Sequence, residues 1–222
     1  MGKTLRVLEI FKSISGEVGL IPQGSPTIFL RLAGCNLKCP YCDTPQSQNL
    51  KGGIARKIDS ILKSIEGLSC KNIVITGGEP LLQKNLQVLI SELRMRAYII
   101  QIETNGTISP DLHHVSSYVV DVKVGLLNII NKLYTPDYHA NVIVHLHKDD
   151  WVKFVIEDES DFHSAVDIYT NWLNQSHFYN YNIAFTAINS ENFGNKQLHD
   201  LIMLNNLDVV QNIQIHKIIG AQ

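Results

Sequence analysis

Three of the four cysteines lie within eight residues, at Cys35, Cys39 and Cys42. They follow the apolar run Thr27 to Leu32, which the pattern predicts to be a buried strand. A loop leaving a strand end can turn three thiols toward one partner, and thiolates suit zinc, copper(I) or iron–sulfur clusters. Structural zinc needs four sulfur or nitrogen ligands, yet no cysteine or histidine occurs between Cys42 and Cys70. The spacing therefore favours a cubane cluster with one iron that lacks a protein ligand.

Composition bounds the fold and the partners. With 222 residues and 45% hydrophobic content, residues 1–222 fit one domain with a substantial core. The net charge is −2 and the nineteen Lys and Arg are scattered, so we expect no direct contact with nucleic acid. The first residues lack a signal-peptide core and no apolar run is long enough for a membrane span, which predicts a cytoplasmic protein. In that compartment clustered cysteines indicate metal or redox chemistry rather than disulfides.

Strand and helix patterns alternate along the chain after a short apolar run at Leu5 to Phe11. Alternation of this kind predicts right-handed crossovers and a parallel sheet. Six or seven strands are too few for the eight of a closed barrel, so we expect an α/β fold, a partial, open (β/α) barrel with about six core parallel strands. The expected strands are Thr27 to Leu32, Asn72 to Thr76, Tyr98 to Glu103, Tyr118 to Val124, Trp151 to Ile156 and Asn182 to Ile188. The expected helices have apolar stripes at Ile54 to Ile65, Leu82 to Leu93, Ala165 to Leu173 and Lys196 to Leu204, and Ile213 to Ile219 is the last apolar run.

Polar residues collect where four of these strands end. The cysteine loop follows the first, and the next three are followed or closed by Gly77-Gly78-Glu79, Glu103-Thr104-Asn105-Gly106 and Asp121-Val122-Lys123. Active sites of such folds lie at the carboxyl ends of the strands. The sequence therefore predicts that all four segments face one pocket.

These residues carry a resemblance to the radical S-adenosylmethionine (SAM) enzymes, in which a CxxxCxxC loop and a Gly-Gly-Glu-Pro turn follow the first two barrel strands. The chain resembles one family more closely, the 7-carboxy-7-deazaguanine synthases of queuosine and 7-deazapurine biosynthesis. The matching landmarks run from residue 9 to residue 217. They are Glu9-Ile10-Phe11, Ser13 to Glu17, Phe29 to Leu37, Cys42-Asp43-Thr44, Ile75 to Leu82, Glu103 to Thr107 and Gln214 to Lys217.

The resemblance implies a barrel of the radical SAM type and a lyase reaction. Cys35, Cys39 and Cys42 would hold a [4Fe-4S] cluster that cleaves SAM to a 5′-deoxyadenosyl radical. Glu79 is implied to accept the SAM ammonium. The other residues implied to contact SAM are Tyr41, Cys42, Asp43, Gly78, Glu103, Asp121, Val122 and Lys123. The family has Ser-Pro-Lys at this last triplet, so Asp121-Val122 departs from it.

The implied substrate is 6-carboxy-5,6,7,8-tetrahydropterin, converted to 7-carboxy-7-deazaguanine with loss of ammonia. Arg31 offers a fork for the substrate carboxylate, and Thr44 matches the position that ligates Mg²⁺. The implied pterin contacts are Ile14, Ser15, Gly16, Glu17, Thr76 and the terminal Gln222. Ser15 replaces the glutamine usual in this family, which removes a long amide from the pterin contacts.

The resemblance also implies partners: a reducing electron donor such as flavodoxin or ferredoxin, and a second copy in a homodimer. Two alternatives remain at this stage. One is a different radical SAM enzyme, such as a glycyl-radical activase, and the other is a non-enzymatic metal-binding module. Cys70 is expected to be a small buried hydrophobe, because a fourth ligand would close the cluster to SAM.

Overall fold

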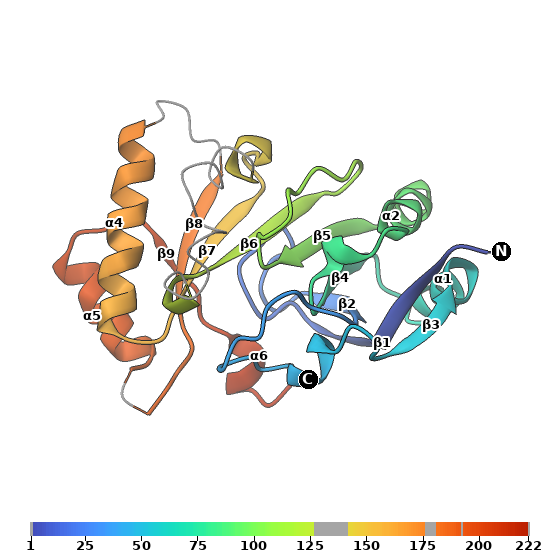
Figure 1. The fold of residues 1–222 in the computed structure, drawn as a ribbon, viewed down its shortest axis with the longest axis horizontal. Helices are drawn as coiled ribbons and strands as arrows, with labels where there is room; N and C mark the ends of the chain where they lie inside the picture. Colours follow the sequence, from blue (N-terminus) through green and yellow to red (C-terminus); the bar gives the residue numbers. More distant parts are fainter. Residues whose placement is uncertain (1, 127–141, 176–180, 192, 222) are drawn as a thin grey trace.

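One nine-stranded sheet runs through the part of the chain that the structure, a computed structural model, describes: residues 2–126, 142–175, 181–191 and 193–221 (Figure 1). The strand order is β3-β1-β2-β4-β5-β6-β7-β8-β9. Neighbours from β2 to β9 are parallel, whereas β1 is antiparallel to β2 and β3. The strands are β1 (Thr4–Ile14), β2 (Pro26–Leu32), β3 (Ile54–Lys57), β4 (Asn72–Gly77), β5 (Ile99–Thr104), β6 (Ser117–Lys123), β7 (Trp151–Ile156), β8 (Asn182–Ala187) and β9 (Val210–Gln211).

Helices flank this sheet, with α1 and α2 toward one end and α4 and α5 toward the other in Figure 1. The short α6 lies beside the loop that follows β2, because Lys217 forms an ion pair with Asp43 at 3.4 Å. The α-helices are α1 (Ile58–Glu66), α2 (Leu86–Met95), α4 (Glu159–Gln175), α5 (Asn195–Leu204) and α6 (Ile215–Ile218). Four 3₁₀ turns are η1 (Pro45–Gln48), η2 (Pro80–Leu82), η3 (Val124–Leu126) and η4 (Ile143–His145). Among the described residues, no helix is long and apolar enough to cross a membrane.

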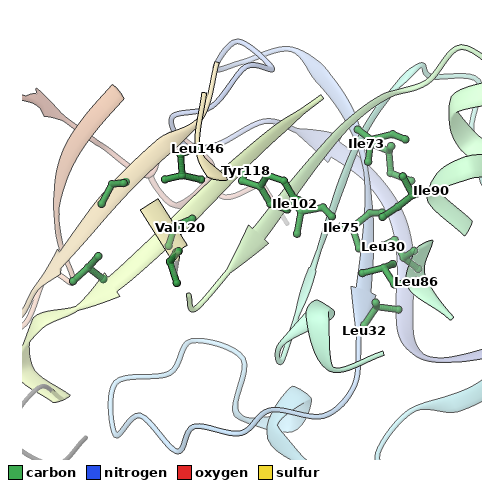
Figure 2. Close-up of a cluster of buried hydrophobic side chains, with 14 of the residues drawn as sticks. Leu30, Leu32, Ile73, Ile75, Leu86, Ile90, Ile102, Tyr118, Val120 and Leu146 are labelled. Atoms are coloured by element: carbon green, nitrogen blue, oxygen red, sulfur yellow. The ribbon is translucent and has the colours of Figure 1, made fainter. Parts of the chain in front are cut away.

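The core lies between the sheet and the helices that cover it. In α1, Ile58, Ile61, Leu62 and Ile65 recur at helical spacing and are all buried. Figure 2 shows Leu86 and Ile90 of α2 packed with apolar side chains of the sheet. Burial of each such side chain contributes about 1.5 to 3 kcal/mol, so these stripes fix the helices on the sheet.

The predicted partial, open barrel is confirmed. Six strands, β2 and β4 to β8, form its parallel body, and the two-residue β9 extends the far edge. The strands β1 and β3 pair antiparallel and extend the other edge of the sheet. The sequence patterns showed only a short apolar run within β1 and placed Ile54 of β3 in the following helix. Because β2 to β8 run in one direction, the segments that follow them meet at one edge of the sheet.

Three local expectations differ from the structure. Ile54 continues the spacing of the α1 stripe but lies in β3, opposite Val7, and its side chain is exposed. Leu82 ends η2 and the helix begins only at Leu86, because Pro80 starts a tight turn and Gln83 has an extended backbone. The last apolar run forms only the four-residue α6, with Ile218 and Ile219 exposed.

Candidate active site

A cavity of about 230 Å³ opens at the carboxyl ends of the parallel strands. The four polar segments predicted to meet there all contribute to its wall. The predicted site residues in the wall are Ser15, Gly16, Glu17, Arg31, Cys35, Cys39, Tyr41, Cys42, Asp43, Thr44, Thr76, Gly78, Glu103, Asp121 and Lys123.

The cysteine loop gives the cavity three thiols, and none of the four cysteines is in a disulfide. In the part of the chain that the structure describes, no three Cys, His, Asp or Glu side chains converge as a single metal ion requires. A cubane takes each thiolate on a different iron, so its ligands need not converge on one point. The donor set, three thiols on one wall, therefore fits a cluster better than a mononuclear zinc ion.

Cys70 lies apart from these thiols, since it precedes β4 and is not in the cavity wall. Its Sγ donates to the backbone oxygen of Pro26, 3.0 Å away, at the start of β2. The amino ends of the strands face away from the cavity, so Cys70 is on the wrong edge of the sheet for a fourth ligand.

The Gly77-Gly78 turn is locked onto the cysteine loop by its backbone. Gly77 has a φ of +133°, and a methyl group there would overlap Leu32. A methyl group on Gly78 would overlap the carbonyl oxygen of Gly34. The Glu79 N–H donates to this same oxygen at 2.7 Å. These glycines therefore let the two loops come into contact. The resemblance had linked Gly78 to a contact with SAM instead.

Glu79, the residue expected to accept the SAM ammonium, does not line the cavity. Its side chain is buried and absent from the wall. The carboxylate accepts hydrogen bonds from the Leu81 N–H (2.9 Å), the Thr104 hydroxyl (2.9 Å) and the Asn105 N–H (2.8 Å). Burial raises the pKa of Glu79, although these three donors oppose the shift. In this structure Glu79 joins the turns after β4 and β5.

Two further residues with expected ligand contacts, Val122 and Ile14, do not line the cavity. Val122 points into the core, because side chains alternate along β6 and only Asp121 and Lys123 face the cavity. Ile14 ends β1 outside the wall, next to Ser15, which is in it. Gln222 lies outside the described residues.

A buried group of charges forms another part of the cavity wall. The Lys153 ammonium pairs with Glu17 and lies 3.0 Å from Asp121, which also pairs with Lys123 at 3.1 Å. Burial alone would lower the pKa of Lys153, but the charges of Asp121, Glu17 and Glu103 outweigh it and raise the pKa. Burial alone would raise the pKa of Glu17, but Lys153 holds it at about 2. Lys153 and Glu17 therefore both carry full charge at neutral pH.

Glu103 behaves differently because it has no cation of its own. Burial and the nearby negative charges of Glu17 and Asp121 raise its pKa to about 7, and Lys153 and a hydrogen bond with Thr76 offset this only in part. Near neutral pH, Glu103 can thus act as either a hydrogen-bond donor or an acceptor.

Two polar residues near the cysteine loop keep binding capacity toward the cavity. Arg31 donates from Nε to Glu9 at 2.7 Å, which leaves the outer edge of its guanidinium for a carboxylate. The Thr44 hydroxyl donates to Asp43 at 3.0 Å, so its oxygen lone pairs remain available to a cation.

Sequence reasoning assigned no site role to several residues of the wall: Lys153, Gln214, His216 and Lys217. A lysine within the otherwise apolar run Trp151 to Ile156 was the available signal for Lys153, since a lysine in a buried strand needs a partner. The Gln214 amide donates to Glu17 at 2.6 Å across 197 positions of sequence, a contact that no local pattern predicts.

Comparison with known proteins agrees with this geometry. A family model described as the radical SAM superfamily matches residues 30–121. The 7-carboxy-7-deazaguanine synthase of Methanospirillum hungatei is 34% identical over 218 residues, covering 97% of this chain and 86% of the relative. The enzyme of the same name from Clostridium acetobutylicum is 35% identical over 224 residues, covering 96% and 95%.

Solved structures show the same fold. The crystal structure of QueE from Escherichia coli superposes with a TM-score of 0.70 and covers 95% of this chain and 94% of that one, at 19% identity. The similarity to these two curated relatives extends over nearly the whole chain. The chain belongs to the 7-carboxy-7-deazaguanine synthase family of radical SAM enzymes.

Proposed function

We propose that this chain converts 6-carboxy-5,6,7,8-tetrahydropterin into 7-carboxy-7-deazaguanine with loss of ammonia, acting as a single domain. The observation that carries the proposal is the meeting, in one cavity, of three thiols and a group of buried carboxylates and lysines. The thiols suit the cluster of a radical SAM enzyme, and the charges suit a polar heterocycle that carries a carboxylate.

The cofactors of this family are a [4Fe-4S] cluster, SAM and Mg²⁺. When bound, the cluster supplies the electron that cleaves SAM to a 5′-deoxyadenosyl radical, and Mg²⁺ supplies a hard positive charge. Cys35, Cys39 and Cys42 would hold the cluster. Tyr41, Asp43 and the backbone of Gly78, which share the cavity wall with these thiols, would contact SAM. Asp121 and Lys123 would contact its ribose.

The remaining polar residues recognise the pterin. The ionised carboxylate of Glu17 can accept hydrogen bonds from the N–H groups of a pterin ring. Glu103 faces the same space and exchanges its proton near neutral pH. Arg31 and Mg²⁺ on Thr44 neutralise the substrate carboxylate, while Ser15, Gly16 and Thr76 complete the wall.

The finer partner assignments are also proposals. The electron comes from a low-potential carrier such as flavodoxin or ferredoxin, because the cofactor chemistry consumes one electron. The family resemblance supports a homodimer. Four cysteines outside disulfides suit a reducing compartment, which supports the cytoplasm.

The decisive experiment is anaerobic reconstitution with iron and sulfide, followed by turnover of carboxytetrahydropterin with SAM, Mg²⁺ and a reductant and by mass analysis of the product. We expect 7-carboxy-7-deazaguanine and about four irons per chain. Cys42→Ala should lose both, whereas Cys70→Ser, the matched control, should keep both. An absence of product from the pterin, or stoichiometric zinc in place of iron, contradicts the proposal.

A further inference from the structure

The orientation of the Asn105 side chain is fixed by its partners. Its amide oxygen accepts the backbone N–H of Thr107 at 3.0 Å and the Thr107 hydroxyl at 2.7 Å. A backbone N–H can only donate, so this end of the amide must be the oxygen. The other end, Nδ2, is therefore an N–H donor, and its direction is determined by the hydrogen-bond network.

That donor faces a thiol of the cysteine loop. Asn105 Nδ2 lies 3.6 Å from Cys35 Sγ and 3.0 Å from Asn36 Oδ1, so each of its two hydrogens has an acceptor. Asn36 donates in turn to the Thr107 hydroxyl at 2.7 Å, which closes the network. The Leu37 backbone N–H is a second donor to Cys35 Sγ, at 3.4 Å. Cys35 thus receives two N–H groups.

The position of Asn105 is held from behind by Glu79. The Asn105 N–H and the Thr104 hydroxyl both donate to the buried Glu79 carboxylate, at 2.8 and 2.9 Å. Asn105 itself is only 5% exposed. A side chain anchored on both sides cannot swing away from Cys35 when the cavity fills.

From this geometry we propose that Asn105 is a positioning residue for the cluster: its side-chain N–H donates to Cys35 Sγ and raises the reduction potential of the bound [4Fe-4S] cluster. The inference rests on the proposed function, since it needs the cluster. An N–H dipole directed at a ligating sulfur stabilises added negative charge, so it favours the reduced state. Its effect is to ease the one-electron reduction that the reaction requires.

The test is an anaerobic redox titration of the reconstituted protein, followed by electron paramagnetic resonance of the reduced cluster. Asn105→Leu keeps most of the side-chain volume without the donor, and Asn105→Ala is a second variant should Leu fail to load iron. We expect a threefold to tenfold lower ratio of reduced to oxidised cluster at a fixed potential. Tenfold corresponds to about 59 mV for one electron.

The matched control is Asn36→Ala, which removes an amide of the same network that does not reach Cys35. It should titrate close to the parent. The assignment of Asn105 is overturned if its variants keep the midpoint potential of the parent protein. It is also overturned if Asn36→Ala shifts the midpoint potential by the same amount. A parent protein without any cubane signal contradicts instead the proposed function, so the two failures are distinguishable.

Discussion

At the scale of single residues, Lys153 has the most demanding role, because its ammonium is buried between carboxylates. Lys153→Met would leave the Glu17 carboxylate buried without its cation and would remove one of the two cations that pair with Asp121. We expect the free energy of unfolding of the cluster-free protein to fall by about 3 to 5 kcal/mol in urea denaturation. Lys196→Met is the matched control, because Lys196 pairs with Asp200 on the surface, where an ion pair contributes little. Equal stability of parent and Lys153→Met would mean that the carboxylates rearrange or take up protons without it.

Glu103 should give the protein a pH dependence near neutrality. Its pKa is raised from 4.5 to about 7 in the folded state, so the unfolded chain releases this proton first. Its contribution to stability is therefore complete below about pH 4.5 and is lost as the pH rises to about 7. We expect Glu103→Gln to flatten the decline in denaturation midpoint over this window, measured on cluster-free protein. A decline of the same slope in the variant would assign the titration to another group.

These residues show what sequence could predict at this scale. Because side chains alternate along a strand, Asp121 and Lys123 face the cavity and Val122 faces the core. The sequence-based interpretation nevertheless expected all three residues to contact SAM. The hydrogen bonds of Glu79 could not be predicted, because a carboxylate at a strand end can face either the cavity or a neighbouring turn, and only the partners decide. Lys153 pairs with Glu17 in the loop after β1 and with Asp121 in β6, and local patterns do not contain such pairings.

At the scale of elements, α6 packs against the loop after β1. The Ile215 N–H donates to the Gly16 carbonyl at 3.0 Å, and a methyl group on Gly16 would overlap the His216 ring. Gly16→Ala should therefore displace His216 from the cavity and raise the KM for the pterin at least tenfold in steady-state assays. Gly67→Ala, at the end of α1, where an added methyl group would make only ordinary van der Waals contacts, should leave the KM unchanged. An unchanged KM in Gly16→Ala would mean that His216 is not needed where it lies.

The elements themselves were largely predictable, since buried parallel strands appear as apolar runs and covering helices as spaced stripes. The exceptions were short or mixed. Ile54 fits a helical stripe by spacing, yet β3 forms because its backbone pairs with β1, which lies about fifty residues away. The two-residue β9 is too short to give any pattern.

At the scale of the whole molecule, segments near the two ends of the sequence meet at one site. Asn212 and Gln214 donate to Glu17, at 3.2 and 2.6 Å, while the cysteine loop is held from the other side by β4 and β5. Pterin recognition should thus depend on the C-terminal segment, and cluster assembly should not. A protein ending at Ile213 should keep about four irons per chain and its circular dichroism, while turnover of the pterin falls at least a hundredfold. Iron loss on truncation would show that the segment supports the cysteine loop as well, through the pair of Lys217 with Asp43.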